Sequence, residues 1–179
     1  MEEPEPALVR AAARGDVASF GSLVRSYQEP VLRFLVRLVG DEALAEDLAQ
    51  ETFLRAHRGL RGFRHRSRFS TWLFAIARNV ATDHYRRTAR QDRAFRMVGA
   101  AAPVDGPDAE VEVQIGLDAL SPKLREALVT IEVLGLRYRE AAVVLGVSEG
   151  TVKSRVFHAR RELARWMRAD DVGEEVEER

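Results

Sequence analysis

A dense group of arginines runs directly into a long amphipathic pattern between Phe63 and Arg87. From position 70 onward the apolar residues recur at the spacing of one helix face. These residues are Leu73, Ile76, Ala77 and Val80. A second stripe, with members seven positions apart, lies about 100–140° away around the same helix. Its members are Trp72, Asn79 and Arg86. We expect the first stripe to pack into a helical core and the second to stay outside it.

The chemistry of this outer stripe indicates a nucleic-acid surface. A tryptophan can stack on an unpaired base, an amide can hydrogen-bond its edge, and arginines can hold phosphates. Three further cations, Arg64, Arg66 and Arg68, lie in the loop that precedes the helix. The alternative is a solvated amphipathic helix with a tryptophan at its edge. The rest of the chain has to decide between the two.

Charge is segregated along the chain although the net charge is zero. Residues 55–96 hold twelve arginines against two aspartates, a net charge of +10, and residues 99–116 carry −4. Residues 117–168 carry +4, and residues 169–179 carry −5. Two basic bodies joined by an acidic linker and followed by an acidic tail favour an extended polyanion as the partner, because phosphate contacts gain from counterion release.

Several function classes are disfavoured by composition. The chain has no cysteine, so disulfides and cysteine-ligated metals are excluded and a reducing, cytoplasmic location is expected. No apolar run reaches the ~18 residues of a membrane span, and the first residues are acidic, unlike a secretory signal. The histidines lack metal-ligand spacing, and neither a glycine-rich phosphate loop nor a nucleophile–base set is present. We therefore expect no membrane insertion, no metal, no cofactor and no enzymatic activity.

The N-terminal half reads as successive helices. We expect residues 1–6 to be frayed, a helix over 7–14, a second helix capped by Asp16, and a third that starts at Pro30 and ends at Gly40. Asp41 then caps a helix with a small-residue inward face. That face consists of Ala45, Leu48, Ala49, Thr52 and Ala56.

The outward face of the helix after Asp41 is acidic within an otherwise basic domain. It carries Asp47, Gln50, Glu51 and Leu54, with Phe53 near its boundary. Acidic and apolar groups are unsuited to DNA, so this face predicts a protein-docking surface. A solvated face that happens to be acidic is the alternative.

Further along the chain a linker separates two domains. Either Ser70 or Thr71 is the expected N-cap of the helix that continues to about Arg87 or beyond. Residues 99–107, with two prolines and two glycines, lack periodicity. We expect a first domain over 7–96, a flexible linker over 97–112, a second domain over 113–168 and an acidic tail over 169–179.

The second domain shows a helix-turn-helix pattern. A helix starts at Ser121-Pro122, with Leu124, Leu128 and Ile131 as its expected core stripe. A short helix over 138–145, with inward Ala141, Ala142 and Leu145, is followed by a turn at Gly146, and Ser148 caps the last helix. The last helix has an inward stripe of Val152, Val156, Ala159 and Leu163. Its basic outer face fits a DNA major groove, although two helices of an ordinary bundle could share the pattern. The fold class expected is all-α, with two small helical domains and a C-terminal helix-turn-helix.

Three segments carry a resemblance to a known family. They are DLAQETFLRAHR (Asp47–Arg58), RFSTWLFAIARNVATDHYRR (Arg68–Arg87) and the stretch Leu120–Leu163. In this order and separation they resemble bacterial RNA polymerase sigma factors of the extracytoplasmic-function (ECF) class of the sigma-70 family. The resemblance implies a two-domain transcription initiation subunit. Its partners would be core RNA polymerase, through the clamp helices of the largest subunit, and promoter DNA, both duplex and single-stranded. By class resemblance alone, an anti-sigma factor is also expected.

The resemblance implies three groups of binding residues. The residues implied for polymerase docking are Asp47, Gln50, Glu51, Phe53 and Leu54. Reading and opening of the minus-ten element falls to Phe63, Arg64, Arg66, Ser67, Phe69, Trp72, Asn79, Tyr85, Arg86 and Arg87. Recognition of the minus-thirty-five duplex falls to Ser148, Thr151, Lys153, Ser154, Arg155, Phe157, His158 and Arg161. At His158 the family often has arginine, so this contact could be weaker or sensitive to pH.

Two other functions stay open from the sequence. A stand-alone helix-turn-helix regulator would bind a two-fold symmetric duplex without polymerase, and it would leave the tryptophan and the arginine-rich loop of the first domain without a role. A nucleic-acid-processing enzyme would need a catalytic set of residues that cannot be identified here.

Overall fold

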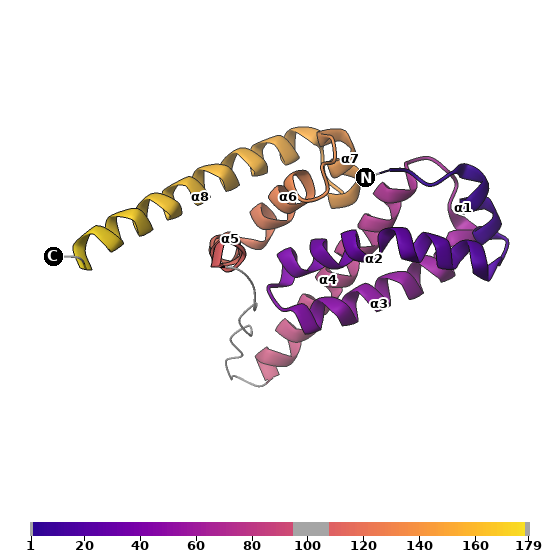
Figure 1. Ribbon diagram of the computed structural model, residues 1–179, viewed down its shortest axis with the longest axis horizontal. Coiled ribbons are helices and arrows are strands. Elements are labelled where there is room, and N and C mark those ends of the chain that lie inside the picture. The colour runs from indigo at the N-terminus through magenta and orange to yellow at the C-terminus, as the bar shows by residue number, and fades with distance from the viewer. Residues whose placement is uncertain (1, 95–107, 178–179) are drawn as a thin grey trace. The chain divides into compact units, whose positions relative to one another are not determined.

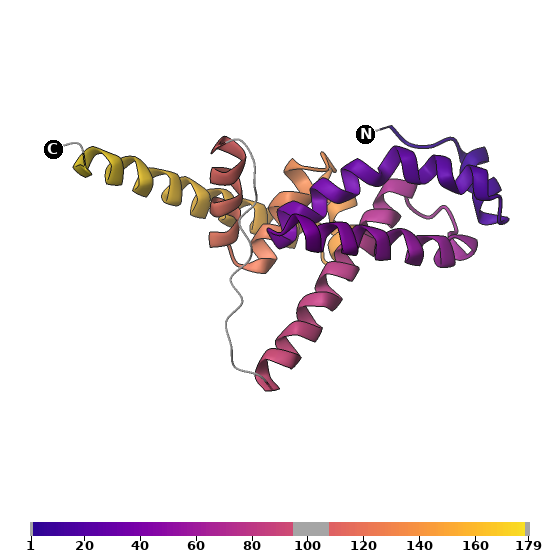
Figure 2. The same ribbon diagram turned by 60° about the horizontal axis from the view of Figure 1, so that its bottom comes forward.

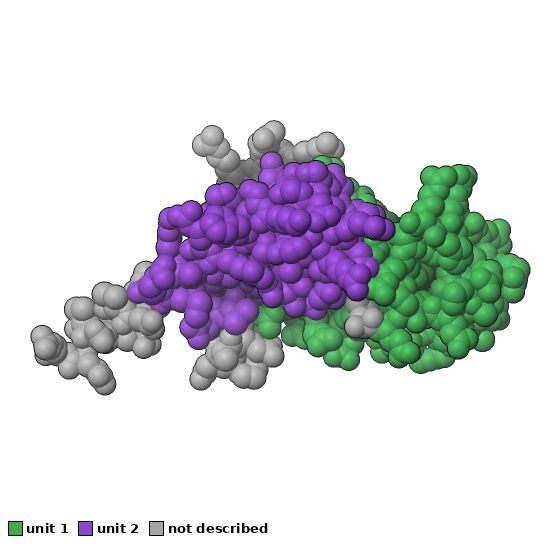
Figure 3. Space-filling model, turned by 90° about the horizontal axis from the view of Figure 1, so that it is seen from above, with its two compact units in different colours: residues 1–102 green, residues 103–179 purple. Residues whose placement is uncertain are grey.

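The computed structural model describes residues 2–94 and 108–177, whose regular secondary structure is helical, with no strand within these limits. For residues 89–94, 108–110 and 169–177 the backbone alone is described. The chain divides into two compact units, residues 1–102 and residues 103–179 (Figure 3). None of the described helices has the length and apolarity needed to cross a bilayer.

Unit 1 is built from α1 (Pro6–Ala13), α2 (Val17–Val39), α3 (Glu42–Gly59), the 3-10 turn η1 (Leu60–Gly62) and α4 (Phe69–Ala94). Helices α2, α3 and α4 pack against one another, with α2 and α3 side by side (Figures 1 and 2). Aromatic side chains fill the core between them. The rings of Phe34 and Phe74 meet edge-to-face at 5.5 Å, and those of Tyr27 and Phe69 at 5.3 Å.

The predicted helix caps of unit 1 are confirmed at two positions. The side chain of Asp16 accepts a hydrogen bond from the backbone N–H of Ser19 at 3.1 Å, and Asp41 accepts one from Leu44 at 2.9 Å. Gly40 ends α2 with φ of 71°, a left-handed conformation that glycine adopts at little cost. The sequence therefore identified correctly where α2 ends and α3 begins.

The prediction of a helix boundary at Pro30 was wrong, because α2 is continuous from Val17 to Val39 with Pro30 inside it. The buried stripe before the proline, Leu23 and Tyr27, continues after it through Val31 and Phe34. This continuous packing offsets the hydrogen bond that a proline removes from a helix interior.

The N-terminal segment was also predicted incorrectly. Residues 2–5 are not frayed, because Tyr27 donates a hydrogen bond from its hydroxyl to the carbonyl of Glu2 at 3.1 Å. Helix α4 begins at Phe69, before both of its predicted caps, Ser70 and Thr71. The carboxylate of Glu3 instead receives the N–H groups of Phe69 and Ser70, at 3.0 and 3.3 Å.

Unit 2 consists of α5 (Asp108–Ala119), α6 (Pro122–Glu132), α7 (Tyr138–Leu145) and α8 (Glu149–Glu177). Helix α8 packs on α5, α6 and α7. Most of the predicted inward residues are buried, but Leu124, Ile131, Ala142 and Leu163 are half-buried. Val129 of α6 and Val144 of α7 are buried as well. The small core of these short helices leaves only part of each predicted stripe fully buried.

The limits of the predicted linker and tail differ from the helices observed. Residues 108–112, expected in the linker, form the first part of α5, and residues 97–107 lie outside the described part of the chain. Residues 169–177, expected as a separate acidic tail, continue α8, while 178–179 are not described. Neither segment contains a helix breaker of sufficient strength to stop the helix at the predicted position.

Candidate functional surfaces

The division of α3 into a buried face and an outward face agrees with the prediction from the sequence. The five small or apolar residues expected inward, from Ala45 to Ala56, are all buried. Asp47 and Gln50 are exposed, Leu54 is 48% exposed, and Glu51 and Phe53 are half-buried. The face therefore presents acidic, amide and apolar groups together.

An apolar groove adjoins this face and extends it onto α2. It has a volume of about 580 Å³, and Glu29, Glu46, Gln50 and His57 lie at its polar positions. Its walls include Phe20, Val24, Leu32, Ala49, Phe53 and Leu54. Phe20 and Val24 of α2 are half-buried in this wall. The spacing of residues 20, 24, 28 and 32, one turn apart, was the available signal for a second face on α2.

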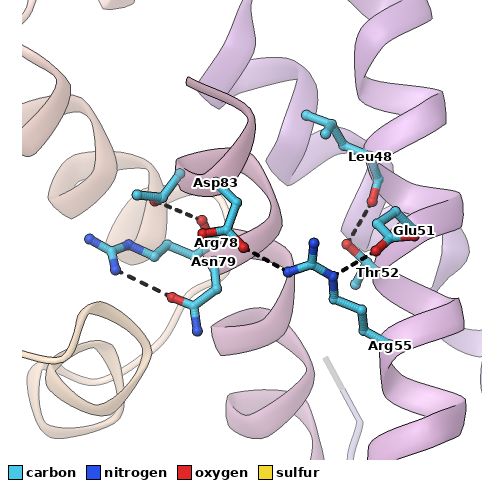
Figure 4. Close-up of polar contacts among 8 residues, drawn as sticks. Leu48, Glu51, Thr52, Arg55, Arg78, Asn79 and Asp83 are labelled. Atoms are coloured by element: carbon cyan, nitrogen blue, oxygen red, sulfur yellow. Dashed lines mark hydrogen bonds and ion pairs between the residues drawn. The ribbon is translucent and has the colours of Figure 1, made fainter. Parts of the chain in front are cut away.

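Glu51 differs from its neighbours on α3 because its carboxylate is already paired (Figure 4). Arg55 donates from Nε to Glu51 at 2.7 Å and from a terminal guanidinium nitrogen to Asp83 of α4 at 2.8 Å. These hydrogen bonds from Arg55 lower the pKa of Glu51 and that of Asp83. The arginine thus joins the candidate docking helix to α4, a role that the sequence analysis missed although the i,i+4 spacing of 51 and 55 was visible.

Aromatic rings connect the loop at residues 63–68 to the start of α4. Phe63 lies 5.1 Å from Trp72 and 6.1 Å from Phe69, and Phe69 lies 5.7 Å from Trp72, all between ring centroids. Phe69 is only 5% exposed, which contradicts its prediction as a DNA-contacting residue: it packs against Tyr27 in the core. Trp72 is half-buried rather than outside the core, because Phe63 covers part of its ring.

A small pocket opens beside Trp72. It has a volume of about 340 Å³ and is bounded by Trp72, Ile76 and Asn79 of α4 together with Arg55. Gly59 and Gly62 complete its lining, and no atom lies within 4 Å of the position where a side chain on Gly62 would start. The structure therefore brings two of the three predicted stripe residues, Trp72 and Asn79, to one cavity with a cation at its edge.

Arg86, the third residue of that stripe, is exposed further along α4 and does not line the pocket. Arg87 is exposed as well, and Tyr85 donates a hydrogen bond from its hydroxyl to the carbonyl of Leu38 at 3.2 Å. In the loop, Arg64 and Arg66 are exposed. Ser67 is half-buried and donates to the carbonyl of Arg68 at 3.2 Å.

The predicted duplex-reading face of α8 is exposed, but several of its groups have partners within the chain. Ser148 caps the helix as predicted: its hydroxyl accepts the N–H of Thr151 at 3.1 Å and hydrogen-bonds the Thr151 hydroxyl at 2.8 Å. Lys153 lies 2.7 Å from Glu149 and 5.7 Å from the ring centre of Tyr138, and the bond to Glu149 raises its pKa. A phosphate or base would therefore have to compete with Glu149 for this lysine.

Next to Lys153, the face continues with an exposed aromatic residue. Phe157 is 58% exposed, with the ring of His158 at 5.6 Å and the guanidinium of Arg161 also at 5.6 Å. Ser154 is exposed and Arg155 is half-buried. The described residues contain no cluster of His, Asp or Glu that could hold a metal ion.

Both units match families of the same kind. Residues 23–91 match the family Sigma-70 region 2, and residues 114–163 match the family Sigma-70, region 4. The probable RNA polymerase sigma-C factor of Mycobacterium bovis is 38% identical over 177 residues, covering 96% of this chain and 95% of that protein. The chain belongs to the ECF class of the sigma-70 family.

Other family members support the same assignment. The RNA polymerase sigma-H factor of Pseudomonas aeruginosa is 37% identical, covering 89% of this chain and 91% of that protein. Among solved structures, the sigma factor RpoE of Bartonella quintana, in complex with the anti-sigma factor NepR, matches with a TM-score of 0.78 at 28% identity, over 86% of this chain and 99% of that one. CnrH in complex with the cytosolic domain of CnrY matches with a TM-score of 0.72 at 30% identity, over 92% and 97% of the two chains.

Proposed function

We propose that this chain binds core RNA polymerase and directs transcription initiation at specific promoters, and that it performs no catalysis of its own. The observation that carries the proposal is the pocket beside Trp72 and Asn79, which adjoins the arginine-rich loop. A flipped base can enter such a pocket, stack on an indole and hydrogen-bond an amide. We assign the flanking phosphates to Arg64 and Arg66, which are exposed in the loop. This unit captures one separated strand of the minus-ten element.

The acidic face of α3 binds the polymerase. Asp47 and Gln50 supply charge and hydrogen-bonding groups, and the adjoining groove supplies apolar area from Phe53 and Leu54. Glu51 acts through its bond to Arg55 as much as through the partner. The protein works in the cytoplasm, with the polymerase.

The outer face of α8 enters the major groove of the minus-thirty-five duplex. Lys153 leaves Glu149 for a base or a phosphate, and exposed Phe157 makes apolar contact with the groove. The domains act as units: residues 7–96 bind polymerase and the minus-ten strand, and residues 113–168 bind the upstream duplex. The relatives whose structures are bound to anti-sigma factors support an inhibitor of the same kind here.

The decisive measurement is transcription by a bacterial core RNA polymerase on a random-sequence promoter library, with and without this chain. We expect initiation at a defined subset of sequences only when the chain is present. If the wild-type chain neither binds core polymerase nor directs initiation, the proposal fails. A stand-alone regulator would instead bind duplex DNA without polymerase at a two-fold symmetric site.

Substitutions separate the surfaces. Asp47→Arg combined with Gln50→Arg is expected to abolish core binding, while Glu112→Arg, an exposed charge reversal on α5, leaves it intact. Asn79→Ala is expected to keep core binding and to reduce minus-ten strand binding roughly fivefold or more, about the cost of one good base contact. Loss of core binding and strand binding together in Asn79→Ala would show unfolding, whereas unchanged strand binding by the folded variant would count against the pocket.

A further inference from the structure

We infer that Glu3 is a positioning residue for the minus-ten site: its carboxylate holds the first turn of α4 and, through it, the pocket that receives the base. This inference rests on the proposed function. From the sequence, residues 1–6 are expected to be frayed, and none of the residues assigned to promoter binding lies among them. The structure places this segment directly on the start of α4.

Glu3 makes a bidentate contact with the beginning of the helix. One carboxylate oxygen accepts the N–H of Phe69 at 3.0 Å, and the other accepts the N–H of Ser70 at 3.3 Å and the Ser70 hydroxyl. The first N–H groups of a helix lack partners within it, and a negative charge at this end is favoured by the helix dipole. Glu3 is therefore the cap of α4, supplied from 66 residues away in sequence.

The backbone next to Glu3 is fixed at a second point. The buried hydroxyl of Tyr27 on α2 donates to the carbonyl of Glu2 at 3.1 Å. Burial and the nearby charge of Glu3 raise the pKa of Tyr27, so its hydroxyl stays protonated and remains a donor. The segment thus ties α2 to the first residue of α4.

The contact reaches the pocket through Phe69. The backbone N–H of Phe69 donates to the Glu3 carboxylate, and its ring packs against both Phe63 and Trp72. Phe63 and Trp72 in turn lie 5.1 Å apart, and Trp72 forms a wall of the pocket. A change in the position of Phe69 therefore shifts the stacking surface for the base.

Glu3 also determines where phosphates can bind. The free N-terminus of a helix attracts anions such as phosphate. With a carboxylate on the N–H groups of Phe69 and Ser70, that position is taken, so the strand backbone is directed to the side chains of Arg64 and Arg66. Glu3 thereby sets the register of the strand as well as the shape of the pocket.

The test uses the full chain with core polymerase and a promoter recovered from the library with wild type. Glu3→Gln removes the charge but keeps the length, and Glu3→Asp keeps the charge on a shorter arm. Glu5→Gln is the matched control, because Glu5 is exposed, two residues away, and caps no helix with its side chain. Each variant is first shown to be folded and to bind core polymerase as wild type does.

The readout is discrimination among bases, which a loss of folded protein alone would not change. The quantity measured is the ratio of initiation at the recovered promoter to initiation at versions with single-base replacements in the minus-ten element. We expect Glu3→Gln to reduce this ratio at least fivefold. Glu3→Asp should recover part of the ratio, and Glu5→Gln should keep the wild-type value. A Trp166→Phe background makes Trp72 the single tryptophan. Its fluorescence is expected to change in Glu3→Gln and not in Glu5→Gln.

Two results would overturn the inference. Glu3→Gln could match Glu5→Gln, or its losses could follow the folded fraction or core binding. Failure of the wild-type chain to initiate at all would refute the proposed function. Normal initiation by wild type with no effect of Glu3→Gln would refute the role of Glu3 alone.

Discussion

Arg55 shows how one residue can serve two surfaces. It lies on α3, yet its guanidinium binds Glu51 on the docking side and Asp83 on α4. Both acidic partners keep part of their surface in water, so the pairs are screened and contribute modestly to stability. Their value is geometric, since the guanidinium fixes how α4 and its pocket lie against α3.

Replacing Arg55 by Gln is therefore expected to lower the free energy of unfolding by about 1 kcal/mol or less. A double-mutant cycle with Asp83→Asn should show a coupling of about 0.5 kcal/mol or more, because the two groups are in direct contact. Denaturant unfolding measures both quantities. Arg58→Gln, an exposed change on the same helix, is the control and should be close to neutral. Additive effects of the pair would contradict the contact.

The same network predicts a pH dependence. The pKa values of Glu51 and Asp83 are lowered in the folded state from their ordinary values of 4.5 and 3.8. The stability they contribute is therefore complete above these values and is lost as the pH falls below them through the folded-state pKa values. Unfolding followed between pH 6 and pH 3 should show a steeper acid loss for wild type than for Arg55→Gln. Parallel curves would count against the network.

At the scale of helices, the ends are decided by single polar groups. Asp16, Asp41 and Ser148 cap α2, α3 and α8 from the adjacent residue, whereas α4 depends on a distant carboxylate. Ser121 stands at the corresponding position before α6 but makes no capping hydrogen bond with its side chain. Two serines in one unit thus occupy equivalent positions with different contacts.

This difference gives a matched pair of substitutions. Ser148→Ala is expected to destabilise unit 2 by about 1 kcal/mol, the usual cost of losing an N-cap. Ser121→Ala should be nearly neutral. Thermal and denaturant unfolding of the full chain, with a signal from Trp166 in unit 2, measure both changes. Equal losses in the two variants would mean that the hydroxyl of Ser148 contributes nothing as a cap.

In the whole chain, the segment 95–107 connects the two compact units covalently. Linking two modest DNA contacts converts the second into an intramolecular event at high effective concentration. Promoter affinity should therefore depend on the connection between the units as well as on their surfaces.

A protease site placed within residues 99–107 tests this dependence. Cleavage of the variant is expected to reduce promoter affinity in the presence of polymerase by roughly 10²-fold or more, while the N-terminal unit keeps its core binding. The uncut variant is the control and should match wild type in a DNA-binding titration. Unchanged affinity after cleavage would show that the two units do not depend on the link.

Local sequence patterns were sufficient to predict the all-α class, the caps at Asp16, Asp41 and Ser148, the buried face of α3 and the helix-turn-helix of unit 2. These features follow from local periodicity and from hydrogen bonds that span three residues, so nearby residues are sufficient to specify them. The family resemblance likewise rests on contiguous segments.

Tertiary structure decided the features that join distant residues. Periodicity could not show that the hydrophobic stripe of α2 continues through Pro30, that Phe63 covers Trp72, or that Phe69 belongs to the core. It also could not show that Arg55 reaches Asp83, or that Glu3 caps α4. Each of these depends on which distant segments meet, and the free energy of such contacts exists only once the chain has brought the partners together.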